Sequence, residues 1–470
     1  SFCLFYKARN GIFNIMSYSK ETPNPLLIEP IEVLVRQKSG GMMIGMLGIM
    51  MFFLVDSWFI SMLGTEALAA MSYIIPVCFI VTCVIMGIGK GMSAIVGRLL
   101  GAQQNRQANR IVTDSLSLSL ILLAILITIG FFTIESLFSF LGANQVTLPY
   151  IVDYMQVWYI GVFFLTIPMV GNAAIRSTGN MRLPATVMIL SGLINAILDP
   201  IFIFILDMGM QGAAIASAVA WILASVMVSY ILQVKLKLID WSWPGFSHIL
   251  SNWSRVLKIS IPTAISQMVN PLAQGFLVWL LSSFGLAGVA AFGIGMRIES
   301  TLLIIAMSLS LIVPTVFGQN YGAGLNQRAS QSILYSIRLI IYVYVLIYLI
   351  LWPLSPIIAT IFSEDQEVID LAVAYLRIVP LSYAMIGLSQ LTSSLLLSLH
   401  KPILSLMINL IPLLIITIPA ALLGAELAGI RGILWGVCLS QITIGAVLYW
   451  YILGLLKSVE NEQQDVVMST

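Results

Sequence analysis

Two stretches of twelve residues decide the fold: GRLLGAQQNRQA at Gly97–Ala108 and GQNYGAGLNQRA at Gly318–Ala329. Five positions match at a constant offset of 221 residues, namely Gly97/Gly318, Gly101/Gly322, Ala102/Ala323, Asn105/Asn326 and Ala108/Ala329. A second pair, GMQGAAIA at Gly209–Ala216 and GIRGILWG at Gly429–Gly436, repeats at an offset of 220. Two matches at nearly one offset predict that the chain consists of two homologous halves in parallel orientation.

The composition indicates that lipid surrounds most of this chain. Hydrophobic residues make up 59% of the sequence and charged residues 9%, and the mean hydropathy is +1.01. Soluble domains carry about 25% charged residues, and about 20 apolar residues suffice to cross the hydrocarbon as a helix. Segments of this kind lie near 41–63, 67–92, 111–134, 149–173, 183–206, 209–234, 257–283, 287–316, 333–362, 369–398, 402–424 and 429–456. The predicted fold class is therefore an all-α polytopic membrane protein, with 12 transmembrane helices in two pseudo-symmetric six-helix lobes.

The distribution of Lys and Arg predicts the orientation. Basic residues, Arg176 among them, gather in alternate connectors, whereas the opposite connectors carry mainly acids, with Arg431 as the main basic exception. By the positive-inside rule, both termini are expected on the cytoplasmic side of a bacterial inner membrane. The expected parts are a leader (1–40), an N-lobe (41–234), an inter-lobe linker (235–256), a C-lobe (257–456) and a tail (457–470). Residues 1–15 are excluded from this argument, as an added remnant or a gene start placed too early.

A family resemblance emerges from these features together. The two lobes, the Gly-x-x-x-Gly-Ala loops and the run Asn195-Ala-Ile-Leu-Asp199-Pro200 resemble the multidrug and toxic compound extrusion (MATE) exporters. The resemblance covers roughly residues 35–455 and points to the branch whose cation site lies in the N-terminal lobe. It implies a monomeric antiporter that exports amphiphilic, often cationic, drugs or dyes by alternating access. It implies neither enzymatic activity nor a resident cofactor.

Few ionisable groups fall inside the predicted spans. Asp56 lies in the first span, Asp199 in the fifth, and Arg297 and Glu299 in the eighth. A charge at such depth costs at least about 2.5–3.5 kcal/mol, so we expect these groups to be functional. The helical rise places Asp56 roughly 22 Å and Asp199 roughly 24 Å from the inner ends of their spans. The two carboxyl groups should therefore share one height in the outer half of the membrane. Arg297 and Glu299 are expected either to pair across the lobes in a coupling role or to lie close to the cytoplasmic ends of neighbouring spans.

The resemblance implies a cation site around this acid pair. In the family, a hydrogen-bonded site is formed by the residues that match Asp56, Tyr154, Asn195, Asp199 and Ser217. Two close carboxylates in a low dielectric cannot both stay ionised cheaply. We therefore expect H⁺ as the coupling ion, and Na⁺ bound at Asp56, Asn195 and Asp199 is the alternative. No other metal is expected.

Two features of the backbone bear on the expected mechanism. Pro200 has no N–H, so the carbonyl of Ala196 should lose its helical partner and the helix should kink, although an ordinary tolerated proline is the alternative. Family members usually carry a proline early in the first span. This chain instead has four glycines there, Gly40, Gly41, Gly45 and Gly48. Glycines can permit bending, but a bend driven by proline is not expected.

The C-lobe has no matching acids. At the offset of 221, Asp56 aligns with Leu277 and Asp199 with Ala420, so the cation site is expected in the N-lobe alone. Three other functions were compared. A lipid-linked precursor flippase needs a basic cavity, and the central spans show few cations. A membrane enzyme needs a metal cluster or a nucleophile–base pair, and none is visible. A passive channel does not need titratable groups confined to one lobe.

Overall fold

The computed structural model describes residues 24–469, and every regular element in that range is helical. The α-helices are α2 (Pro25–Ile28), α3 (Ile31–Ser61), α4 (Thr65–Gly101), α5 (Asn105–Phe140), α6 (Thr147–Ser177), α7 (Arg182–Pro200), α8 (Gly209–Tyr230), α9 (Phe246–Ser282), α10 (Leu286–Leu302), α11 (Ile304–Gly322), α12 (Asn326–Phe362), α13 (Gln366–Ile378), α14 (Tyr383–Ser398), α15 (Pro402–Pro412) and α16 (Ile418–Ser469). Three π-helices, η1 (Ile201–Ile205), η2 (Ile231–Lys235) and η4 (Leu413–Thr417), and one 3-10 helix, η3 (Val379–Ser382), extend or join them. Helices are expected here, because a spanning segment must satisfy its own backbone hydrogen bonds in lipid.

The helices account for the twelve predicted spans. Eleven helical segments in the described range are long and apolar enough to cross a membrane. The longest, Pro402–Asn461, holds two spans, because the backbone leaves the helical conformation at Ala428 and Gly429. The predicted span 287–316 is broken at Leu303, between α10 and α11. The prediction of twelve transmembrane helices is confirmed.

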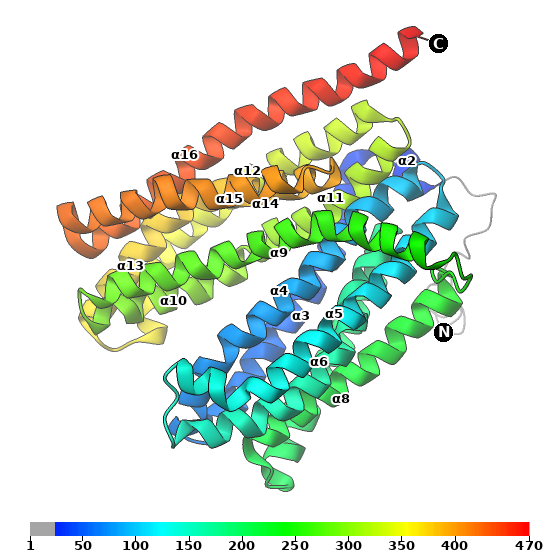
Figure 1. The fold of residues 1–470 in the computed structure, drawn as a ribbon. Coiled ribbons are helices and arrows are strands. Elements are labelled where there is room, and N and C mark those ends of the chain that lie inside the picture. The colour runs from blue at the N-terminus through cyan, green and yellow to red at the C-terminus, as the bar shows by residue number, and fades with distance from the viewer. Residues whose placement is uncertain (1–23, 470) are drawn as a thin grey trace, which may run out of the picture.

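The helices gather into two bundles (Figure 1). One contains α3 to α8 and the other α9 to α16, and the bundles converge at the end that carries α2. Each bundle has its own hydrophobic core, with Trp158 buried in the first and Tyr383 in the second. The two-lobe architecture is therefore confirmed.

The exact boundaries of the predicted parts stay predictions. Helix α3 already begins at Ile31, inside the predicted leader, and α9 begins at Phe246, inside the predicted linker. Residues 1–15, which were set aside, lie outside the described residues.

The repeated glycine motif forms the contact between the lobes. A Cβ atom on Gly101 of α4 would overlap the carbonyl of Gln319, and one on Gly322 of α11 would overlap the carbonyl of Arg98. Glycine is needed at both positions because the two backbones touch directly. The motif that revealed the duplication in the sequence is thus the surface through which the two halves meet.

The two halves differ in where their spans become π-helical. The π-helix η1 follows Pro200, which ends the 19-residue helix α7, whereas η4 follows Pro412, which ends the 11-residue helix α15. The two π-helices therefore lie at different depths of their spans. At the offset of 221 the position that matches Asp199 is Ala420, which is apolar.

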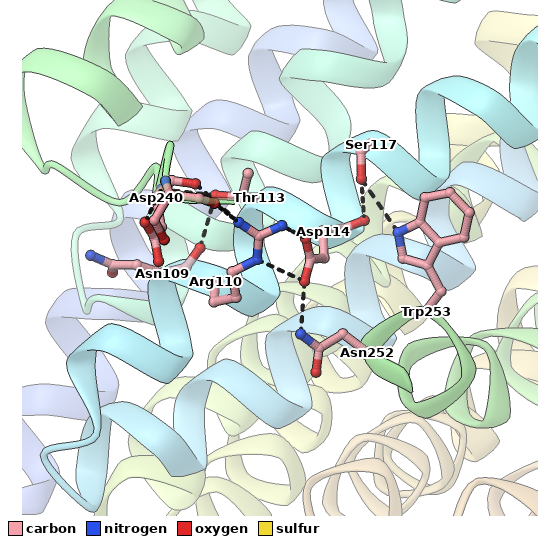
Figure 2. A network of polar contacts seen from close by, with 9 residues as sticks. Asn109, Arg110, Thr113, Asp114, Ser117, Asp240, Asn252 and Trp253 are labelled. Atoms are coloured by element: carbon pink, nitrogen blue, oxygen red, sulfur yellow. Dashed lines mark hydrogen bonds and ion pairs between the residues drawn. The ribbon is translucent and has the colours of Figure 1, made fainter. Parts of the chain in front are cut away.

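A polar network fixes the segment between the lobes to α5 (Figure 2). Arg110 forms an ion pair with Asp114 and donates a hydrogen bond to the carbonyl of Ser242 at 2.6 Å. The amide of Asn252, on α9, donates to Asp114 at 2.7 Å. Because Asp114 is almost completely buried, these two donors compensate a charge that would otherwise be costly. The network therefore anchors the start of the second bundle on the first.

Candidate functional site

Close packing of α3 on α7 brings the two predicted acids together. A Cβ on Gly45 would lie 2.9 Å from Ala185, and one on Gly192 would overlap the ring of Phe52. A glycine of each helix thus lets the other helix pack closely against it, and these contacts fix the register of α3 on α7. One turn beyond Phe52, α3 presents Asp56 to α7.

The carboxyl groups of Asp56 and Asp199 lie within hydrogen-bonding reach of each other. Asp199 is completely buried, and its Oδ1 accepts a hydrogen bond from Asn195 Nδ2 at 3.1 Å. Among the described residues, no N–H or hydroxyl group donates to its Oδ2. A hydrogen bond between two carboxyl groups requires one shared proton, because two carboxylates are both acceptors. A hydrogen bond between Asp56 and Asp199 would therefore require a proton on one of them.

Two further predicted residues surround this pair. Asn195 Nδ2 also donates to Ser217 Oγ on α8, at 3.2 Å. Tyr154 of α6 is buried and close enough to interact electrostatically with both acids. Within residues 24–469, no hydrogen bond links its hydroxyl directly to either carboxyl group. The structure thus brings all five predicted side chains into one region of the N-lobe, and hydrogen bonds join three of them, Asn195, Asp199 and Ser217.

The backbone beside the acids is irregular. Helix α7 ends at Pro200, and η1 continues it with wider turns, in which the Leu206 N–H bonds to the Ile201 carbonyl at 2.9 Å. Single π-helical turns frequently occur at functional sites. That the carbonyl of Ala196 binds water or a cation stays a prediction.

The glycines of the first span have a packing role. Gly45 and Gly48 face Ala185 and Ile189 of α7, within 2.9 and 3.0 Å of an added Cβ. Larger residues there would push the two helices apart. The predicted bending of this span is a separate property and stays a prediction.

Among the described residues, no hydrogen bond or ion pair of the Arg297 or Glu299 side chain crosses between the lobes. Tyr375 Oη donates to Glu299 Oε2 at 2.6 Å, and both residues belong to the C-lobe. Arg297 is exposed, and its backbone carbonyl accepts from Ser300 and Thr301. A coupling role for these residues stays a prediction.

Sequence reasoning missed a pair of cations inside the fold. Lys90, on α4, donates to Gln267 Oε1 of α9 at 2.8 Å and lies close enough to Arg176 to interact electrostatically. Arg176 was assigned to a connector, and Lys90 was not singled out in its apolar surroundings. The available signal was a single lysine between two glycines in VIMGIGKGMSAIV, residues 84–96.

Comparison with known proteins agrees with this architecture. The MatE family profile matches residues 42–201 and 262–423, once in each half. A protein of Shewanella oneidensis named "FAD transporter" is 37% identical over 94% of this chain and 99% of its own length. The "Multidrug export protein MepA" of Staphylococcus saprophyticus is 24% identical over 88% of this chain and 92% of its own.

Solved structures show the same fold. The Vibrio cholerae MATE transporter VcmN in the bent form superposes with a TM-score of 0.87 at 27% identity, covering 91% of this chain and 98% of that one. An outward-facing multidrug resistance MATE family transporter gives a TM-score of 0.88 at 25% identity, over 94% and 100% of the two chains. These matches identify this multi-span protein as a membrane transporter of small molecules, and not as an enzyme. The chain belongs to the MatE family, as the resemblance to MATE exporters predicted.

Proposed function

We propose that this protein is a secondary active exporter driven by protons that bind to Asp56 and Asp199. The observation that carries the proposal is the contact between these two carboxyl groups beside the π-helix of span five. Adding a proton turns the pair from two repelling acceptors into a hydrogen-bonded unit, and removing it forces the acids to separate or to recruit another cation. Such a change can bias the packing of α3 against α7.

The contacts between the lobes support alternating access. Thr315 Oγ1 of the C-lobe donates to the Arg176 carbonyl at 2.9 Å, and Gln319 Nε2 donates to the Ser177 carbonyl at 2.5 Å. Both contacts join the C-terminal end of α6 to α11, and α11 also contacts α2, which lies at the end where the bundles converge in Figure 1. In an alternating-access cycle these contacts form in one state and break in the other. With both termini in the cytoplasm, the structure would correspond to the outward-facing state.

Two classes of cargo have support. Several relatives carry names of multidrug export or resistance proteins, which favours amphiphilic drugs or dyes. The Shewanella relative named for FAD is the more similar of those described above, and it matches nearly the whole chain, which favours a flavin nucleotide. The two classes differ in charge, because FAD carries phosphate groups and many exported dyes are cations.

Transport into proteoliposomes tests the coupling. The full-length protein is reconstituted, a pH gradient or a Na⁺ gradient is imposed, and uptake of ethidium and of FAD is followed separately. If the proposal holds, uptake depends on the pH gradient, and Asp199→Asn reduces the gradient-driven part about tenfold or more. Uptake that follows only the Na⁺ gradient would replace H⁺ by Na⁺ at the same acids. Scrambling of lipids without any gradient would favour a flippase instead.

A further inference from the structure

Lys90 and Arg176 form a cationic pair at the junction of three helices. An added Cβ on Gly91 would lie 2.5 Å from Ser260 Oγ of α9, and one on Gly89 would lie 3.5 Å from Ala173 of α6. The intervening Lys90 therefore lies where α4 passes between α6 and α9. Its hydrogen bond to Gln267 crosses from the N-lobe to the C-lobe.

No acidic side chain compensates these two charges. Among the described residues, the one ion pair joins Arg110 to Asp114 and involves neither Lys90 nor Arg176. Lys90 has a neutral amide as its hydrogen-bond partner, and no bond from the Arg176 guanidinium to another described residue is found. Both residues are half-buried. Their like charges repel each other, and no described acid offsets that repulsion. A bound anion would offset it.

We propose that Lys90 and Arg176 form an anion subsite between the lobes, which takes a phosphate group of the transported molecule. This inference rests on the proposed export function and deepens it, by assigning an anionic cargo of the flavin-nucleotide class. Arg176 offers a planar fork to two phosphate oxygens, and Lys90 offers a mobile point charge. Because Lys90 and Gln267 belong to different lobes, a phosphate that draws Lys90 away also releases a contact between the lobes.

Binding of three flavins tests the subsite. The full-length protein is placed in nanodiscs of neutral lipid, and the affinities for FAD, FMN and riboflavin are measured from flavin fluorescence. These probes share the ring system, but riboflavin has no phosphate. If the subsite binds phosphate, FAD and FMN should bind more tightly than riboflavin. Lys90→Gln should weaken both nucleotides by about tenfold or more, the usual effect of one lost hydrogen bond to a charged group, and leave riboflavin unchanged.

Charge-conserving variants distinguish the loss of a charge from the loss of the fold. Lys90→Arg and Arg176→Lys should keep the preference for nucleotides, whereas Arg176→Gln should lose it. Lys258→Gln removes an exposed lysine from the same helix as Gln267 and should bind all three flavins as the wild type does. Equal affinities for FAD and riboflavin in the wild type would overturn the subsite. An unchanged preference in the Lys90→Gln, Arg176→Gln double variant would overturn it as well.

A phospholipid headgroup carries the same phosphate chemistry, so the membrane is varied too. Nanodiscs with added phosphatidylglycerol should reduce FAD affinity only modestly if the subsite serves the cargo. A Lys90→Gln effect on phosphatidylglycerol retention alone, with no effect on flavins, would refute the cargo assignment. The coupling proposal is tested separately. If both proposals hold, Asp199→Asn loses gradient-driven uptake but keeps the preference for nucleotides at equilibrium.

Discussion

The ring of Phe52 on α3 fills the space that a side chain at Gly192 on α7 would need. This contact lies one turn from Asp56, so it fixes how closely the two acid-bearing helices approach. We predict that Gly192→Ala forces the helices apart and costs about 1–3 kcal/mol through overpacking. Uptake driven by the pH gradient should fall along with the thermal stability.

Gly275→Ala provides the matched control for this substitution. Gly275 lies inside α9, and nothing lies within 4 Å of a Cβ added there. It should leave both thermal stability and uptake unchanged. If Gly192→Ala behaves like Gly275→Ala, the packing of α3 on α7 does not set the geometry of the acid pair.

Neutralising either acid should uncouple transport. In Asp199→Asn or Asp56→Asn, the pair can no longer exchange a proton while it keeps nearly the same shape. We expect the gradient-driven part of uptake to fall about tenfold or more, the equivalent of about 1.4 kcal/mol. Asp207→Asn is the control, because Asp207 is exposed and Asn tolerates its left-handed backbone, with φ of 52°. Wild-type coupling in both acid variants would exclude this site.

The buried pair of Arg110 and Asp114 should contribute strongly to stability. Asp114→Ala leaves the charge of Arg110 without its partner, which typically costs about 3–5 kcal/mol. A thermal unfolding series in detergent measures the loss. Glu135→Gln, which changes an exposed acid on the same helix, should have almost no effect. The double variant Arg110→Met, Asp114→Leu should recover part of the loss, because it removes both buried charges.

The connector between α14 and α15 should respond to acid. His400 Nδ1 lies 3.0 Å from Arg98 of the opposite lobe. Burial, and then the charges of Arg98 and Arg255, lower the pKa of His400 from 6.5 to about 4. The unfolded chain therefore binds this proton more readily than the folded one. The stabilising contribution is complete above pH 6.5 and is lost as the pH falls from 6.5 toward 4.

The variant His400→Asn isolates this effect. Asn is neutral throughout the range and accepts the left-handed backbone of position 400, with φ of 58°. The difference in melting temperature between the wild type and His400→Asn should shrink or reverse between pH 6.5 and 4. A constant difference across that range would mean that His400 titrates freely in the folded protein.

The sequence predicted heights in the membrane better than directions around a helix. The rise of a helix is fixed, so residue counting placed Asp56 and Asp199 at one level. That the two side chains face each other depends on the contact of α3 with α7, which the family resemblance supplied and residue counting did not. The cation pair shows the same limit. Arg176 was assigned to a connector from its position in the chain, and the inward direction of its side chain became apparent only in the packed structure.

The glycine contact of the two lobes also carries information about origin. Gly101 meets the backbone of Gln319, and Gly322 meets the backbone of Arg98. In the repeat, Gly101 corresponds to Gly322 and Arg98 to Gln319, so each half offers the same patch to the same patch of the other. This reciprocity is the signature of a two-fold symmetric homodimer. The chain thus preserves, within one polypeptide, the interface through which two copies of an ancestral six-helix protein would have associated before their genes were fused.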